Sequence, residues 1–361
     1  MIHILDNAQL TAAKSGCATQ LSLTFNGLKL HILADNRAVL DELESYYSGL
    51  CEDRGVDTEQ RVYLLDREPD TGSVQWTQVK RKKTSQLGLK EAFCDTPGGR
   101  WIHKLRTGMV MFQSLTDPMV IGDLMANPSQ VVNFINNQFL NHYQRQGYLL
   151  GHAAAFDVDG DTTAIAASSG GGKSTLMLRA LETESARFLS NDRILFRPEQ
   201  GQVSVLGVPK HPRVNPGTLI NSERLIPILP ASQRARFEAM TTSELWDIEQ
   251  KYDVLIPKMY GDNRISLAGT LKNLILLDWS LDAETPTSLT RVDIHKTPEA
   301  LAGLRKSPGP FFQQADGSFP PERTAPAQTY GEFLEGVQVL RLTGRTDFDR
   351  AIELLQAKGI L

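Results

Sequence analysis

The residues best suited to chemistry lie in one glycine-rich stretch near the middle of the chain. It reads Ser168-Ser169-Gly170-Gly171-Gly172-Lys173-Ser174-Thr175 and lies between an apolar predicted strand, 162–167, and a predicted helix that starts with 176–181. In this arrangement, consecutive backbone N–H groups converge on a phosphate at the helix N-terminus, where the peptide dipoles also favour negative charge. The stretch therefore predicts a phosphate-binding P-loop. A Gly/Ser-rich turn that holds no ligand is the alternative.

Individual loop positions have chemical roles in this prediction. Lys173 would reach the β- and γ-phosphates of a nucleoside triphosphate, and the Ser174 hydroxyl would ligate the Mg²⁺ that bridges them. Ala167 stands where the usual pattern begins with glycine, and we expect alanine, the smallest alternative, to be tolerated there. No Asn-Lys-x-Asp guanine-reading motif occurs, which disfavours a GTPase. The expected cofactors are ATP and Mg²⁺.

A carboxylate that could act in phosphoryl transfer follows 18 residues after Ser174. Residues 188–192 predict a short strand that ends in Asp192. At the carboxyl edge of a neighbouring strand, this side chain would lie beside the metal and the γ-phosphate, where it could orient or deprotonate an acceptor hydroxyl. Phosphoryl transfer depends mainly on alignment and charge neutralisation, so one such carboxylate is sufficient. The alternative is that Asp192 is a turn or cap residue.

A short basic loop stiffened by three prolines is the next candidate. Within residues 207–218, Lys210 offers a point charge and Arg213 a planar fork, so the loop could clamp a transferring phosphate or the substrate. A proline-rich surface turn is the alternative. Three charged residues of a later segment are candidates for a lid: Asp253, Lys258 and Arg264.

The elements that precede the glycine-rich loop indicate a smaller α+β domain. Asn26-Gly27 between two alternating apolar segments predicts a β-hairpin, and Asp35 and Asn36 are candidate caps for a helix that follows, through Glu44. A helix that begins at Asn127-Pro128 has apolar residues at helical spacing until Gly147 and leads into a second domain. Further strands are expected at 61–65, 74–79 and across 92–112.

The second part of the chain has the pattern of an α/β domain. We place an accessory α+β domain at 1–145 and the P-loop kinase domain at 146–361. The strands 148–158 and 162–167 are joined by a turn short enough for an antiparallel hairpin, so the sheet is expected to be mixed. The remaining expected elements are an insertion of helices and loops at about 221–262, a buried strand at 271–278, a flexible loop at 308–326, a strand at 336–342 and a helix capped by Thr346-Asp347.

Composition excludes several classes of protein. With 41% hydrophobic and 22% charged residues over 361 positions, the chain is neither collagen-like nor disordered. A net charge of −4 supplies no general attraction for nucleic acid or anionic lipid, and we expect the basic run Lys80–Lys83 to be a solvated loop. The three cysteines form no CxxC pair and are expected to be reduced. No apolar run approaches the roughly 18 residues of a membrane span. We therefore expect a cytoplasmic protein with no nucleic-acid or membrane partner.

Three segments and their spacings resemble the HPr kinase/phosphorylase superfamily, in particular an HPr-kinase-related type B kinase. They are Gly151-His152-Ala153-Ala154, residues 167–174 and Leu189-Ser190-Asn191-Asp192. The resemblance extends over roughly 148–219 and implies a P-loop kinase domain whose nucleotide core is similar to that of phosphoenolpyruvate carboxykinase.

The resemblance also implies residue roles. The family's histidine before the loop falls on His152, its phosphate-binding lysine on Lys173, its magnesium serine on Ser174 and its catalytic aspartate on Asp192. His152 could polarise that aspartate or contact a phosphate, and a satisfied core side chain is the alternative.

Two positions depart from the family pattern. Asn191 replaces the first member of a usual Asp pair, and Thr175 replaces a common Glu. The loss of carboxylates near the metal puts in doubt the reverse phosphorolysis reaction of the best-known members, whereas the forward kinase reaction needs only one base.

The leading hypothesis is an ATP-dependent phosphotransferase that moves the γ-phosphate to a hydroxyl acceptor, either a serine of a small partner protein or a small metabolite. A non-catalytic nucleotide-binding regulator or scaffold, in which Asn191 marks lost catalysis, is the alternative. Carboxykinase chemistry is disfavoured because no His/Lys/Asp set for its extra metal is recognisable. Type B members look, as a family, like parts of small bacterial gene sets with an ATP-grasp enzyme and a short amphipathic protein, which is the first candidate acceptor. Assembly into a homo-oligomer stays open.

Overall fold

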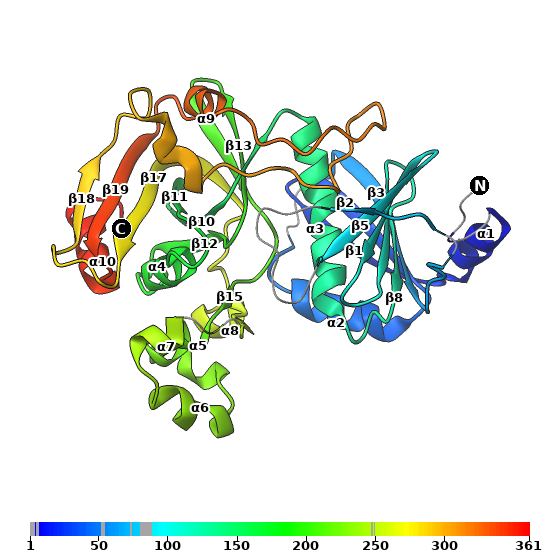
Figure 1. The fold of residues 1–361 in the computed structure, drawn as a ribbon, viewed down its shortest axis with the longest axis horizontal. Helices are drawn as coiled ribbons and strands as arrows, with labels where there is room; N and C mark the ends of the chain where they lie inside the picture. Colours follow the sequence, from blue (N-terminus) through cyan, green and yellow to red (C-terminus); the bar gives the residue numbers. More distant parts are fainter. Residues whose placement is uncertain are drawn as a thin grey trace. The chain divides into compact units, whose positions relative to one another are not determined.

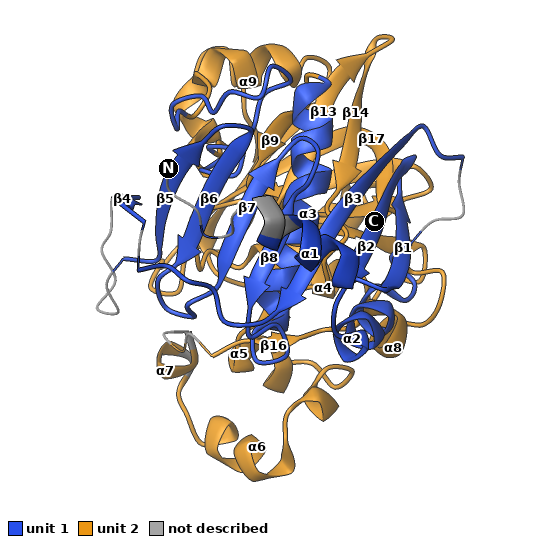
Figure 2. Ribbon diagram, turned by 90° about the vertical axis from the view of Figure 1, so that its right-hand side faces the viewer, with its two compact units in different colours: residues 1–146, 307–323 blue, residues 147–306, 324–361 orange. Residues whose placement is uncertain are grey.

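The chain folds into two compact units, each built on its own β-sheet (Figure 2). Unit 1 comprises Met1–Gln146 and Ser307–Arg323, and unit 2 comprises Gly147–Lys306 and Thr324–Leu361. No described helix is long and apolar enough to cross a membrane. The basic run Lys80–Lys83 lies outside the described residues. The computed structural model describes residues 4, 7–51, 55–72, 74–79, 89–246, 248 and 250–361.

Unit 1 is an α+β arrangement around an eight-stranded sheet of order β1-β2-β3-β8-β7-β6-β5-β4. The predicted hairpin is confirmed, because β1 and β2 pair antiparallel across Asn26 and Gly27, whose φ angles are 48° and 91°. Asn36 caps α2 by accepting a hydrogen bond from the Ala38 N–H. The elements of unit 1 are α1 (Asn7–Gly16), β1 (Thr19–Phe25), β2 (Leu28–Ala34), α2 (Arg37–Tyr47), β3 (Thr58–Asp66), β4 (Thr77–Gln78), β5 (Glu91–Thr96), β6 (Gly99–Lys104), β7 (Val110–Ser114), β8 (Met119–Gly122) and α3 (Pro128–Arg145).

Residues 307–323 form a loop without helix or strand, as expected, but they pack with unit 1. Phe311 and Gln313 are buried. The buried amide of Asn141 on α3 donates to the Phe311 carbonyl at 2.9 Å and accepts from the Gln313 N–H at 2.8 Å, much as a neighbouring strand would. The Pro and Gly content suggested flexibility, but a buried ring and two satisfied backbone groups hold the segment in place.

Arg100, on β6 of the unit 1 sheet, also contacts this segment. Its guanidinium forms two hydrogen bonds with the Asp95 carboxylate and donates to the Pro310 carbonyl at 3.2 Å. It also lies 4.2 Å from the ring centroids of both Phe93 and Phe319. This cation–π pair ties the end of the segment to β5.

Unit 2 is built on a nine-stranded sheet (Figure 1). The sheet contains both parallel and antiparallel pairs, as the sequence predicted. The long strand β17 pairs with β11 on one side, and with β14 and then β19 on the other. Its pairings with β11 and β19 are parallel, whereas β10 pairs antiparallel with β11 and β12. The elements are β9 (Leu149–Gly151), β10 (Ala153–Val158), β11 (Asp161–Ala166), α4 (Lys173–Ala180), β12 (Ala186–Ser190), β13 (Ile194–Glu199), β14 (Gln202–Gly207), β15 (Arg213–Val214), α5 (Pro216–Ile220), the 3-10 helix η1 (Ile226–Ile228), α6 (Ala231–Glu238), α7 (Thr242–Trp246), β16 (Tyr252–Asp253), α8 (Ile256–Tyr260), β17 (Ala268–Ser280), β18 (Ser288–Arg291), the 3-10 helix η2 (Pro298–Gly303), α9 (Ala327–Phe333), β19 (Gln338–Arg345) and α10 (Phe348–Ala357).

The strand predicted over 148–158 is divided at His152. β9 pairs with β13, whereas β10 pairs with β11 and β12, so the chain changes partners at this residue. The His152 N–H donates instead to the carbonyl of Leu304, just beyond η2, at 2.6 Å. The backbone of His152 is therefore held between two parts of the sheet.

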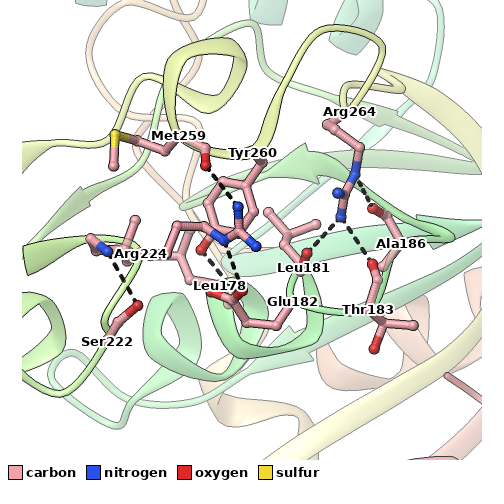
Figure 3. Close-up of polar contacts among 11 residues, drawn as sticks. Leu178, Leu181, Glu182, Thr183, Ala186, Ser222, Arg224, Met259, Tyr260 and Arg264 are labelled. Atoms are coloured by element: carbon pink, nitrogen blue, oxygen red, sulfur yellow. Dashed lines mark hydrogen bonds and ion pairs between the residues drawn. The ribbon is translucent and has the colours of Figure 1, made fainter.

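The far end of α4 is held by a later segment of unit 2 (Figure 3). The last carbonyls of a helix have no partner within it. Here the Tyr260 hydroxyl donates to the Leu178 carbonyl at 3.1 Å. Arg264, a candidate lid residue, is instead a cap: its guanidinium donates to the carbonyls of Leu181 (2.5 Å), Thr183 (2.9 Å) and Ala186 (3.0 Å).

Removing the Asn141 amide should loosen residues 307–323. Asn141→Ala leaves one backbone carbonyl and one N–H without their partner, so the free energy of unfolding should fall by about 2–4 kcal/mol. Urea denaturation measures the change, and limited proteolysis should cut more rapidly within 307–323. Asn137→Ala removes an amide one turn earlier on α3 and should cost less than about 1 kcal/mol; equal losses in the two variants would contradict the anchoring role.

Arg264→Ala should destabilise unit 2 by about 2–4 kcal/mol, because three carbonyls between the end of α4 and the start of β12 lose a charged donor. Arg264→Lys keeps the positive charge but loses the planar guanidinium, so its free energy of unfolding should lie between those of Arg264→Ala and the wild type. Arg224→Ala is the matched control: it breaks an exposed ion pair with Glu182 and one exposed hydrogen bond to the Met259 carbonyl, and it should cost about 1 kcal/mol or less in urea denaturation. A loss for Arg264→Ala as small as that of the control would refute the capping role.

Candidate functional site

The glycine-rich loop joins β11 to α4, as the sequence predicted. Gly170 and Gly172 have φ angles of 81° and 91°, which favour glycine over any residue with a side chain. Ser168, Ser169 and Gly170 are exposed, so the loop is open to solvent. The loop is thus partly open to solvent and leads into the N-terminus of α4, a position that favours anions.

Ala167 fits at the start of the loop because its neighbours are glycines. A Cβ added to Gly171 would lie 2.8 Å from the Cβ of Ala167. A Cβ added to Gly303, at the end of η2, would lie 3.0 Å from the Ala167 carbonyl carbon. Room for the Ala167 side chain therefore depends on Gly171, and close approach of η2 to the Ala167 backbone depends on Gly303.

Lys173 is buried beside the loop rather than extended into solvent. Its Nζ donates to the carbonyls of Ala167 and Ser168, each at 3.0 Å. Burial lowers the pKa of the Lys173 ammonium to about 8; the charge of Asp192 opposes this shift, and that of Lys306 adds to it. A bound anion would favour the charged ammonium.

Asp192 and His152 meet at the edge of the sheet where the loop begins. β12 lies beside β10 and not beside β11, so Asp192 is one strand further from the loop than a direct neighbour would be. The Nε2 of His152 lies 3.3 Å from Oδ1 of Asp192, and the Asp192 side chain remains 53% exposed, so a solute could reach it. His152 is therefore paired with a carboxylate and is not a core residue satisfied by apolar packing.

The charge on Asp192 is strongly favoured. Burial by itself raises the pKa of this carboxyl, but the hydrogen bond with His152 and the charges of Arg193 and Lys306 outweigh burial and hold the pKa well below its usual range. Asp192 is thus an anion at neutral pH and only a weak base.

Asn191 contributes no charge next to Asp192. Its Oδ1 is buried and has no hydrogen-bond partner among the described residues. An amide can neither take up a proton near neutral pH nor neutralise a cation. The site therefore has one carboxylate at the end of β12, as the sequence indicates.

The basic loop contributes Lys210 to the site, whereas Arg213 is already paired. Burial lowers the pKa of Lys210, and the charge of Asp192 opposes that shift. Arg213 pairs with Asp253 across β15 and β16, with 3.2 Å between Nε and Oδ1. Asp253, a candidate lid residue, thus partly neutralises Arg213.

Thr175 links α4 to the end of the basic loop. Its hydroxyl oxygen lies 2.8 Å from that of Thr218 in α5, which occupies one of its hydrogen-bonding directions. Thr175 therefore has a structural partner at the position where the family pattern commonly has a carboxylate.

Lys306 acts electrostatically on the candidate site, which the sequence did not predict. Its charge acts on both Lys173 and Asp192. Its N–H donates to the hydroxyl of Tyr330 at 3.0 Å, and this buried hydroxyl in turn donates to the Leu150 carbonyl at 2.5 Å. No local pattern distinguishes Lys306, because only the tertiary structure brings it to the loop.

Two aromatic residues beside the loop were also missed. The indole N–H of Trp279, near the end of β17, donates to the Gly171 carbonyl at 3.1 Å. Phe348, at the start of α10, contacts the Trp279 ring edge-on, with 5.1 Å between the ring centroids. A tryptophan near the end of a predicted buried strand was a signal that could have indicated this position.

The oxygen donors at the loop fit Mg²⁺ bound together with phosphates. No group of three His, Cys, Asp or Glu side chains that could hold a metal alone occurs in the part of the chain that the structure describes. Mg²⁺ in phosphoryl-transfer sites needs only one or two carboxylates, because phosphate oxygens and waters complete its shell. The Ser174 hydroxyl and the Asp192 carboxylate are ligands of the required type.

Comparison with known proteins finds little similarity. No protein-family model and no curated protein matches this chain. Among solved structures, the chain is similar to the Hpr(Ser) kinase/phosphatase from Coxiella burnetii, with a TM-score of 0.30 and 13% identity. The match covers 58% of this chain and 90% of that chain. A likeness of this size does not establish a shared fold or a family.

Proposed function

We propose that this protein is an ATP-dependent phosphotransferase that moves the γ-phosphate to a hydroxyl acceptor. The observation that carries the proposal is the position of the Asp192–His152 pair at the sheet edge where an exposed glycine-rich loop meets the buried Lys173. The motifs that resemble the HPr kinase/phosphorylase superfamily support the same reaction class.

The loop and Lys173 bind the triphosphate in this mechanism. Backbone N–H groups at the start of α4 and the Lys173 ammonium stabilise phosphate charge. Ser174 and Asp192 would hold Mg²⁺, which supplies charge neutralisation across the phosphates when it is bound. The charge of Lys306 adds to the positive field around these groups.

Asp192 orients the acceptor hydroxyl more than it removes a proton from it. A carboxylate with a strongly lowered pKa is a weak base, but it accepts a hydrogen bond from a hydroxyl well. In a loose transition state the attacking oxygen needs alignment first and loses its proton late. His152 is a positioning residue in this scheme, because it orients the Asp192 carboxylate.

The acceptor is a serine of a small partner protein or a small metabolite. The half-exposed Asp192 side chain supports approach of such a hydroxyl from solvent. Incubation with γ-labelled ATP, Mg²⁺ and a lysate of the source organism, followed by identification of the labelled species, tests the proposal. ATP binding without labelling of any acceptor would favour instead a nucleotide-binding regulator, the function to which Asn191 points.

Lys173→Ala should weaken binding of Mg²⁺-ATP by roughly tenfold or more, because a buried cation that contacts phosphate is lost. Isothermal titration calorimetry measures the affinity. Lys358→Ala, which removes the same charge from an exposed position after α10, should bind as the wild type does. Unchanged affinity in Lys173→Ala would place nucleotide binding elsewhere.

Asp192→Asn should change ATP binding little and phosphoryl transfer strongly. The variant keeps the side-chain shape but loses the charge, so ATP should bind within several-fold of wild type while phosphoryl transfer falls by roughly two to four orders of magnitude. A dominant role as metal ligand would instead weaken the Mg²⁺ dependence and nucleotide affinity together. Single-turnover transfer and a Mg²⁺ titration distinguish these roles.

Asn191→Ala is the matched comparison for Asp192→Asn. It should lower phosphoryl transfer only slightly, because the amide neither binds a proton nor neutralises charge. Wild-type transfer in Asp192→Asn, or equal losses in these two folded variants, would refute the role given to Asp192.

A further inference from the structure

The glycine-rich loop has two chemically different flanks. Asp192 and His152 lie on the flank formed by β10 and β12. The other flank is formed by β17 and β19, which run parallel to β11 and end at the same edge of the sheet. Ligands of such sheets bind beyond the carboxyl ends of the parallel strands, so both flanks border the place of a ligand on the loop.

Trp279 and Phe348 form the second flank. The last residue of β11, Ala166, pairs with Leu276 of β17, so Trp279 lies beyond the end of β11 and beside the loop. Its indole N–H reaches the Gly171 carbonyl. Figure 1 shows α10, which begins at Phe348, beside α4.

Both rings contact the loop at its last glycine. A Cβ added to Gly172 would lie 3.0 Å from Cζ of Phe348 and 3.6 Å from Cζ2 of Trp279. The rings meet at 80°, edge to face. Both rings remain partly exposed. In contrast, Leu274, Ile275 and Leu276, which precede Trp279 on β17, are buried. Part of the surface of these two rings therefore stays accessible at the end of the loop next to Lys173.

We propose that Trp279 and Phe348 form the surface on which the base of the nucleotide stacks. This inference rests on the proposed function, since it assumes that the loop holds the triphosphate. The terminal phosphates lie towards Lys173 and Asp192, and the base lies towards the opposite flank. Every base has an aromatic face, so such a surface favours a nucleoside triphosphate over an inorganic polyphosphate without selecting one base.

Comparing ATP with inorganic tripolyphosphate tests this role, because tripolyphosphate has the same phosphate chain without a base. Calorimetry with Mg²⁺ is carried out on the wild type, Trp279→Leu, Trp279→Phe and Phe348→Leu. Trp279→Leu and Phe348→Leu should bind ATP roughly five- to hundredfold more weakly and tripolyphosphate within twofold of wild type. Trp279→Phe keeps an aromatic face but loses the N–H donor, and should retain ATP affinity within about threefold.

Phe348→Leu keeps the hydrogen bond between Trp279 and Gly171, so it tests the proposal even where Trp279→Leu fails to fold. Equal weakening of ATP and tripolyphosphate would show that the rings only support the loop and would overturn the proposal. Unchanged ATP affinity in Phe348→Leu and Trp279→Leu would overturn it as well. Wild-type protein that binds neither ligand would refute the triphosphate site itself, which distinguishes failure of the proposed function from failure of this inference.

Discussion

The parallel pairing of β11 with β17 is the constraint on which the candidate site depends. The pairing runs from Asp161 opposite Thr270 to Ala166 opposite Leu276, and the central residues of both strands are buried. Because parallel strands end at the same edge, the glycine-rich loop after β11 and the Trp279 ring come together there. β19 extends the same edge on the far side of β17 and brings the start of α10 to the loop.

Charged groups at this edge are held by backbone contacts. His152 stands where the chain changes strand partners, and its N–H is bound by the Leu304 carbonyl. Lys306 follows shortly after Leu304, and its N–H is bound by the buried Tyr330 hydroxyl. These two contacts fix the backbones of His152 and Lys306, whose side chains act on the negative charge of Asp192. Positive charge held near the reacting groups favours phosphoryl transfer.

Glycine positions determine how closely the segments approach one another. Gly303 allows η2 to contact the start of the loop, and Gly171 leaves room for the Ala167 side chain. Gly207 of β14 passes so close to the Leu189 carbonyl that a Cβ there would overlap it. The site residues after β12 and after β14 are thereby brought near each other, which places Lys210 within the electrostatic reach of Asp192.

Local sequence patterns were sufficient to determine several regular elements in each unit. Asn26-Gly27 predicted a hairpin, Asp347 a helix cap, and the apolar run before Ser168 a strand followed by a helix, because turns, caps and periodicity depend on neighbouring residues. The mixed sheet followed from the short turn between β10 and β11. The glycine-rich loop was recognisable for the same reason, since its residues are contiguous.

Only the tertiary structure decided which distant residues surround that loop. No local pattern indicates the role of Lys306, and Trp279 is marked only by its position near the end of a predicted strand, because strand order brings both towards the loop. Charge alone did not indicate the ion pair of Arg213 with Asp253 or the contacts of Arg264 with the carbonyls after α4. The segment 307–323 reads as a flexible loop but is fixed by Asn141. In each case the deciding interaction joins residues far apart in the chain, and its energy depends on burial and geometry that a linear pattern does not contain.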